Sequence, residues 1–236
     1  MIDSLIACPR CHSPLGLEEN GEYGCNNCFI LYGFEEGILD LYYSPLPDFD
    51  GLQPYMWSDF YFLENLLNKI VKPGMVITEI CSGANYVVPA ILNRLNFKVT
   101  YISIGDYIPH LKKQQEGIPS FPIHSIIGDA TSLPLQSNSV DIFIGHHAIN
   151  DIWLSKGDVG VEASIRESFR VVKPGGYIIH SHNYNAIDEL RLGDQSCRKV
   201  NLHTITSFMD EKWEITMENG GELDWLIARK NYGMQE

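Results

Sequence analysis

The stretch MVITEICSGANYVVPAILNRL, residues 75–95, decides the fold because a single turn in it joins a strand to a helix. Its first residues, MVIT, form a short apolar run of the kind found in strands buried on both faces. Its last residues, VVPAILNRL, are typical of a helix. Between them, residues 79–86 read EICSGANY and include one glycine, Gly83, where the chain must turn sharply. The stretch therefore predicts a strand–turn–helix unit of an α/β sheet.

The same alternation continues along the chain. Helix-like segments separate further apolar runs of strand length, which are Val99–Ile104, His124–Ile127, Val140–Ile144 and Tyr177–His180. Before the first strand, residues 60–70 carry apolar side chains at helical spacing. Near the end, WEITMEN, the turn GG and LDWLIARK predict an antiparallel hairpin. The fold class is thus α/β, with a mostly parallel sheet covered on both faces and closed by that hairpin.

Composition and charge narrow the function classes. The 236 residues are 44% hydrophobic and 20% charged, which suits an ordinary globular protein with ample material for a core. The formal net charge of −13 disfavours nucleic acid as a partner, since a phosphate backbone would be repelled. The first residues do not resemble a signal peptide, and no apolar run reaches the roughly 20 residues of a membrane span. We expect a cytoplasmic protein with no membrane partner.

Four of the six cysteines form two C-x-x-C knuckles, Cys8-Pro-Arg-Cys11 and Cys25-Asn-Asn-Cys28. This spacing holds two pairs of thiolates in a way that suits one tetrahedral zinc ion. Because four thiolates fill the coordination shell, the predicted zinc is structural rather than catalytic. A segment this short cannot bury its own core, so zinc would supply the missing folding energy. The rival interpretations are a redox dithiol and two disulfides, and a reducing compartment disfavours stable disulfides.

The knuckles belong to a longer pattern. Tyr32 and Gly37-Ile38 follow them, before an apolar end to the segment. This pattern resembles the zinc ribbon of the small activator subunit of tRNA and protein methyltransferases, and the N-terminal finger of some rRNA guanine methyltransferases. The Pro- and Gly-containing stretch SPLPDFDGLQP then reads as a linker. We therefore predict a zinc ribbon at 1–43, a linker at 44–54 and an α/β domain at 55–236.

The order of elements in residues 55–232 resembles the class I S-adenosylmethionine-dependent methyltransferases, whose sheet is Rossmann-like. The first motif of that family is an acid followed by alternating glycines. Glu79 fills the acid position, Cys81 the first glycine, Gly83 the second and Asn85 the third. The resemblance implies that this loop passes close to the carboxypropyl end of S-adenosylmethionine. Cys81 and Asn85 are departures from the glycine pattern, and Asn tolerates left-handed backbone better than most residues.

Two further slots follow the second and third strands. The resemblance puts the acid that holds the ribose hydroxyls at Ser103, and the nearest acid, Asp106, comes three residues later. In GDATSLPL, Asp129 matches the acid that contacts the adenine amino group, and Ala130 offers a backbone contact. ESFRVVKPGGYIIHS resembles the R-V-L-K-P-G-G turn before the fifth strand, in which the glycines permit a tight reversal.

Candidate catalytic residues follow the fourth and fifth strands, in GHHAIND and HSHNYN. Ligands of such sheets bind outside the carboxyl ends of the strands, so His146, His147, His180 and His182 could converge near the transferred methyl group. A neutral histidine there could take the proton of an attacking hydroxyl, amine or thiol, and we favour His146 or His147. His146 would then also lie against the cofactor. A second metal site made of these histidines is the weaker interpretation, since neighbouring strand residues point to opposite faces.

We therefore predict an S-adenosylmethionine-dependent methyltransferase that acts on a small-molecule or peptide-like acceptor, with a zinc ribbon that could bind a protein partner. Two alternatives stay open. One is an rRNA or tRNA base methyltransferase, which a basic patch would support; its members would be Arg10, Lys112, Lys113, Arg191, Arg198 and Lys199. The other is a non-catalytic relative that binds or regulates a partner.

Overall fold

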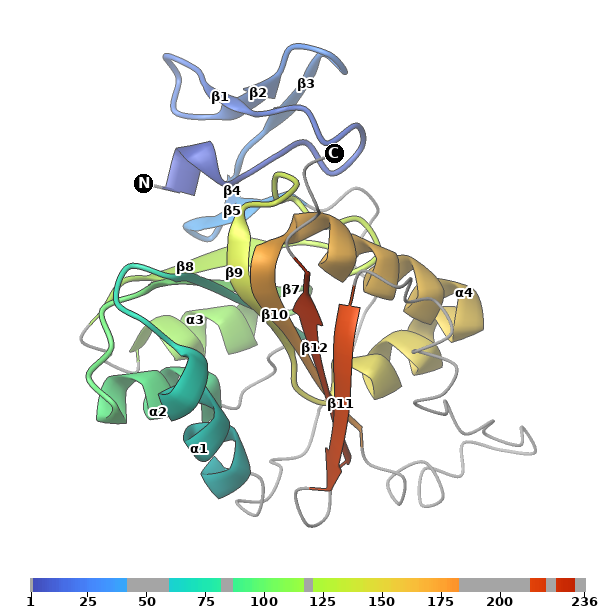
Figure 1. The fold of residues 1–236 in the computed structure, drawn as a ribbon. Helices are drawn as coiled ribbons and strands as arrows, with labels where there is room; N and C mark the ends of the chain where they lie inside the picture. Colours follow the sequence, from blue (N-terminus) through green and yellow to red (C-terminus); the bar gives the residue numbers. More distant parts are fainter. Residues whose placement is uncertain are drawn as a thin grey trace.

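The computed structural model describes residues 2–41, 60–81, 87–116, 121–182, 213–219 and 224–231, coloured by sequence in Figure 1. The predicted linker at 44–54, together with Gly83 and Asn85, lies outside these residues. Among the described helices, none is both long and apolar enough to cross a membrane.

One nine-stranded sheet forms the body of the protein, in the order β11-β12-β10-β9-β6-β7-β8-β5-β4. The bounds are β4 Phe34–Glu35, β5 Ile38–Asp40, β6 Val76–Ile80, β7 Thr100–Gly105, β8 Ile123–Ile127, β9 Val140–Gly145, β10 Val172–His182, β11 Trp213–Asn219 and β12 Asp224–Lys230. From β10 to β5 every neighbouring pair is parallel, whereas β12 and β11 close one end as an antiparallel hairpin. The predicted α/β fold with its closing hairpin is confirmed.

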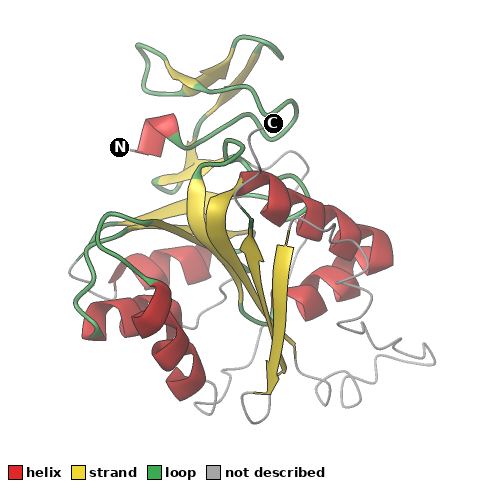
Figure 2. Cartoon of the chain, viewed as in Figure 1, coloured by secondary structure: helices red, strands yellow, loops and turns green. Residues whose placement is uncertain are grey.

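Helices cover both faces of the sheet (Figures 1 and 2). On one face lie α1 (Phe60–Ile70), α2 (Val87–Arg94) and α3 (Ile108–Glu116), and on the other lies α4 (Ala148–Val171). Successive side chains of a strand point to opposite faces of the sheet, so each strand contributes to both cores. Ile77 and Trp225 belong to the core under α1 and α2, whereas Ile80 and Phe143 belong to the core under α4.

Three glycines shape the break inside α4 and the turn inside β10. Gly157 breaks α4 with φ 64° and ψ −162°, a conformation that a side chain disfavours strongly. The predicted turn at Pro174-Gly175-Gly176 lies inside the span of β10, where the pairing with β9 shifts register between Val172 and Tyr177. Gly175 has φ 82°, and a Cβ on Gly176 would lie 2.7 Å from the carbonyl oxygen of Asp141. Both glycines are therefore required by the geometry of the turn.

The N-terminal segment divides between two sheets. A short 3-10 helix, Ile2–Ser4, precedes a separate three-stranded sheet of β1 (Gly16–Leu17), β2 (Tyr23–Cys25) and β3 (Ile30–Tyr32), at the top of Figure 1. The following strands, β4 and β5, lie within the segment 1–43 that we assigned to the ribbon, but β5 pairs in parallel with β8. The apolar run Ile38–Leu39 of this segment therefore completes the main sheet.

Candidate functional site

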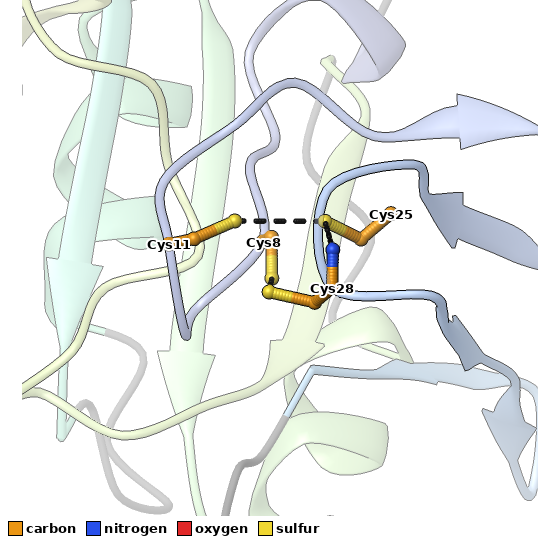
Figure 3. Close-up of side chains that lie close together, drawn as sticks. All are labelled: Cys8, Cys11, Cys25 and Cys28. Atoms are coloured by element: carbon orange, nitrogen blue, oxygen red, sulfur yellow. Dashed lines mark hydrogen bonds between the residues drawn. The ribbon is translucent and has the colours of Figure 1, made fainter.

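The four knuckle cysteines meet at one point, as Figure 3 shows. Their sulfur atoms all lie within 4.8 Å of one another. Cys8 Sγ is 3.9 Å from Cys28 Sγ, and Cys11 Sγ is 3.6 Å from Cys25 Sγ. Four sulfurs about 2.3 Å from a tetrahedral zinc ion are about 3.8 Å apart, whereas a disulfide needs about 2.05 Å. The arrangement therefore fits one zinc ion and does not fit disulfides.

Neighbouring groups support this cluster of sulfurs. The hydroxyl of buried Tyr32 lies 3.1 Å from Cys8 Sγ, where it can donate to a thiolate. The backbone N–H of Cys28 donates to Cys25 Sγ at 3.4 Å. Such outer contacts orient metal ligands and stabilise their charge. Tyr32, which the sequence pattern singled out beside the knuckles, is thus placed against a cysteine ligand.

At the carboxyl end of β6, Glu79 still belongs to the strand, whereas Cys81 is the first residue after it. Glu79 is 1% exposed, in the strand, and its carboxyl group accepts a hydrogen bond from the Tyr101 hydroxyl. Burial raises the pKa of Glu79 to about 8, and the Tyr101 hydrogen bond opposes that rise. Cys81 follows the strand with φ 51°, in the left-handed region. The backbone is thus left-handed directly after the strand, and the sharp turn predicted at Gly83 lies outside the described residues. Glu79 is a buried, largely protonated acid at neutral pH.

The carboxyl end of β7 offers Asp106 rather than Ser103. Ser103 is fully buried inside the strand, which continues to Gly105. Asp106 is the first residue after the strand, and burial raises its pKa. Of the two candidates for the ribose slot, Ser103 therefore lies inside the strand and Asp106 lies at its exit.

The loop after β8 carries Asp129 and Ala130. Asp129 Oδ1 accepts hydrogen bonds from the backbone N–H and the hydroxyl of Thr131, both at 2.8 Å. Asp129 Oδ2 pairs with Lys156 of α4. Burial alone would raise the pKa of Asp129, but the Lys156 and Thr131 hydrogen bonds outweigh it and lower that pKa. Asp129 is therefore ionised and already engaged by a cation.

Acids from three elements lie around Cys81. The pKa of the Cys81 thiol is raised by burial and then by the charges of Asp151, Asp106 and Asp129. Burial and the charge of Asp106 raise the pKa of Asp151 to about 6. Lys156 is a cation beside this group, and the sequence analysis missed it. In the sequence, only the neighbouring Gly157 could have pointed to Lys156, because Gly157 breaks α4 directly after it.

The candidate catalytic histidines do not all converge. His146 and His147 lie together after β9, with ring centroids 4.5 Å apart. His146 stacks on Trp225 at 5.7 Å, on the α1 side of the sheet, whereas His180 lies against Phe143 at 5.6 Å, in the core under α4. The side chain of His182 lies outside the described residues. His146 and His180 therefore lie on opposite faces of the sheet.

The environment of the paired histidines affects their chemistry. Burial, with a smaller effect of His147, lowers the pKa of His146 to about 3. The backbone N–H of His147 donates to the Ser181 hydroxyl at 3.0 Å, which fixes the first turn of α4 against β10. Among the residues that the structure describes, the four cysteines form the sole group arranged to hold a metal ion. The described side chains of His146, His147 and His180 belong to no such group.

Comparison with known proteins agrees with this geometry. Residues 78–180 match the family model described as "Methyltransferase domain". A curated relative, the demethylmenaquinone methyltransferase of Desulfitobacterium hafniense, is 31% identical over 113 residues, which are 46% of this chain and 42% of the relative. The chain thus matches less than half the length of that relative.

Solved structures share the fold. A SAM-dependent methyltransferase from Aquifex aeolicus has a TM-score of 0.52 and 18% identity, over 71% of this chain and 88% of that one. A chain from the complex that contains the Haloferax volcanii Trm112 methyltransferase activator has a TM-score of 0.56 and 10% identity, over 74% and 91%. At these identities the likeness is one of fold.

Proposed function

We propose that the protein transfers the methyl group of S-adenosylmethionine to a small-molecule or peptide-like acceptor. One observation carries the proposal. Cys81, Asp106 and Asp129 follow the carboxyl ends of three adjacent parallel strands, β6, β7 and β8. Ligands of open α/β sheets bind outside these carboxyl ends. The match of residues 78–180 to the methyltransferase domain supports the same site.

Each proposed contact comes from this chain's own residues. We assign the ribose hydroxyls to Asp106, the acid at the exit of β7, because Ser103 lies inside the strand. Asp129 and the backbone of Ala130 are assigned to the adenine, and the turn at Cys81 to the carboxypropyl end, together with Gly83 and Asn85 beyond the described residues. When bound, the donor supplies a methyl group on a positively charged sulfur. The neighbouring carboxylates favour that positive charge.

The proton of the acceptor needs a base. His146 is neutral at pH 7, but a pKa of about 3 makes it a poor proton acceptor. We therefore assign proton removal to His147, with the stacked His146 holding the turn beside it. The acceptor remains a class rather than a compound. Demethylmenaquinone, which the curated relative's name indicates, is the first small molecule to test.

A structural zinc ion at Cys8, Cys11, Cys25 and Cys28 completes the proposal. The short sulfur–sulfur distances support it. The ribbon also offers a surface for a protein partner, because three of its large apolar side chains, Leu17, Phe29 and Leu31, are more than half exposed.

The two alternatives differ in their support. The pairing of Asp129 with Lys156 favours the non-catalytic relative, since the proposed adenine acid is already engaged. For the base methyltransferase, the chain's charge is unfavourable, and Lys112 of the candidate basic patch pairs with Glu36. The other patch side chains, apart from Arg10, lie outside the described residues.

Isothermal titration of S-adenosylmethionine into zinc-loaded protein tests the proposal. We expect micromolar binding that is lost in Asp129→Ala and kept in Asp158→Ala, an exposed control in α4 that accepts a hydrogen bond from Trp153 at 3.0 Å. Methyl transfer from radiolabelled donor to demethylmenaquinone, with His147→Ala as the variant, tests turnover. No heat and no thermal stabilisation at millimolar donor would refute the methyltransferase and support the non-catalytic relative.

A further inference from the structure

The ribbon holds the loop that carries Asp129. Residues 5–9 run beside residues 132–136, and Ile6 forms an antiparallel bridge with Leu135. The N–H of Ala7 donates to the carbonyl of Pro134 at 3.0 Å, and the N–H of Gln136 donates to that of Leu5 at 2.8 Å. These backbone hydrogen bonds tie the loop to the segment that leads directly into Cys8.

Ser132 joins the first knuckle to Asp129. Its hydroxyl donates to the carbonyl of Pro9, which lies between Cys8 and Cys11. Its backbone N–H donates to the carbonyl of Asp129 at 3.0 Å. Ser132 is thus hydrogen-bonded both to the first knuckle, at Pro9, and to Asp129 at the proposed donor site.

A second set of contacts clamps the same loop from α4. Glu167 Oε2 accepts the N–H of Leu133 at 2.7 Å, and Glu167 Oε1 is 4.0 Å from Nε2 of His12, next to Cys11. Arg170 donates to the carbonyls of Leu133 at 2.9 Å and Leu135 at 2.7 Å. The loop therefore lies between the ribbon and α4, and among these α4 contacts the one between Glu167 and His12 reaches the first knuckle.

We propose that the ribbon positions the donor site. Metal at the four cysteines fixes the first knuckle, and the hydrogen bonds of Ser132 to Pro9 and Asp129 then hold Asp129 in place. A short four-cysteine segment takes its structure from the metal, so metal loss would release Pro9 and with it the loop. Ser132 acts through Asp129 and is a positioning residue rather than a catalytic one. The role of Asp129 rests on the proposed function, whereas the coupling of ribbon to loop does not.

Hydrogen–deuterium exchange on the full chain tests the coupling without any ligand. We expect Ser132→Ala, with its zinc retained, to exchange faster than wild type in peptides covering 128–136, and Ser137→Ala to match wild type. Ser137 is exposed and makes one 3.4 Å contact with Arg170, so it is a matched control in the same segment. A chelator should open the loop together with peptides covering 8–28.

Donor affinity provides the second readout. Loss of one hydrogen bond is worth about fivefold in affinity, so Ser132→Ala should bind S-adenosylmethionine about fivefold more weakly than wild type and Ser137→Ala. Unchanged loop exchange in Ser132→Ala, or loop protection that persists after the ribbon has opened, would overturn the coupling. If wild type does not bind the donor, the proposed function fails, and the exchange result alone still decides whether the ribbon orders the loop.

Discussion

Glu79 should make the stability of this protein fall as pH rises, and Glu79→Gln should remove that dependence. The carboxyl group is 1% exposed, and the Tyr101 hydroxyl donates a hydrogen bond to it. Because burial favours the protonated form, the pKa rises from its ordinary value of 4.5 to about 8 in the folded protein. Glutamine has the shape of a protonated glutamic acid and keeps an oxygen to accept the Tyr101 hydrogen bond.

The sign and size follow from proton linkage. Below pH 4.5 both folded and unfolded chains hold the proton, so the stabilising effect is fully present there. Between about 4.5 and 8 the unfolded chain loses its proton while the folded chain keeps it, and the free energy of unfolding falls by about 1.4 kcal/mol per pH unit. The total is about 5 kcal/mol, an upper figure because unfolded chains are partly compact.

Urea unfolding of wild type and Glu79→Gln at pH 5, 6, 7 and 8 measures this. We expect the variant's advantage to grow by several kcal/mol from pH 5 to 8. Zinc loading also changes with pH, but it affects both proteins and cancels in the difference. Glu214→Gln, an exposed strand position, should show no such trend. A constant difference between Glu79→Gln and wild type across the range would refute the buried, protonated carboxyl group.

Three further predictions concern the metal, the helix break and the histidines. The purified protein should release one zinc per chain to a colorimetric chelator after its thiols are blocked, and Cys28→Ser should bind it far more weakly; a full complement in the variant would contradict the four-sulfur site. Gly157→Ala should cost about 1–3 kcal/mol in chemical unfolding because φ is 64° and ψ −162°, whereas Gly16→Ala, with open space at its Cβ, should cost less. In NMR, His146 should stay neutral from pH 8 to 5, since its pKa is about 3. Acid should destabilise the fold, because the unfolded chain binds a proton on His146 below about pH 6.5 whereas the folded chain does not. Titration of His146 near pH 6 would show that the ring is not buried as described.

Periodicity predicted the fold well because parallel strands buried on both faces leave an unmistakable apolar run. Five such runs became β6 to β10, and the closing hairpin became β11 and β12. Knuckle spacing predicted the sulfur cluster for a similar reason, since C-x-x-C fixes two sulfurs on one turn. The strands β4 and β5 were missed as part of the main sheet, because two or three residues carry no readable period.

The candidate site was predicted less completely because it depends on strand ends and on side-chain direction. The second strand was expected at Val99–Ile104 and lies at Thr100–Gly105, so Ser103 falls inside the strand whereas Asp106, the other candidate, lies at its exit. Asp129 and Lys156 pair across 27 positions of sequence, a contact that only the packing of α4 creates. Patterning likewise could not show that His146 and His180 lie on opposite faces.

The edge of the sheet explains why the ribbon and the α/β body should behave as one unit. Without β5, strand β8 would expose a row of backbone N–H and C=O groups, which favours aggregation. Leu39 and Asp40 pair with Ile126 and Ile127, and the N–H of Leu41 donates to the carbonyl of Ile127 at 2.8 Å. The new outer strand, β4, has two residues, and so short an edge is a poor template for another chain. The same N-terminal segment therefore joins the α/β body at two places, the edge of the sheet through β5 and the loop through residues 5–9.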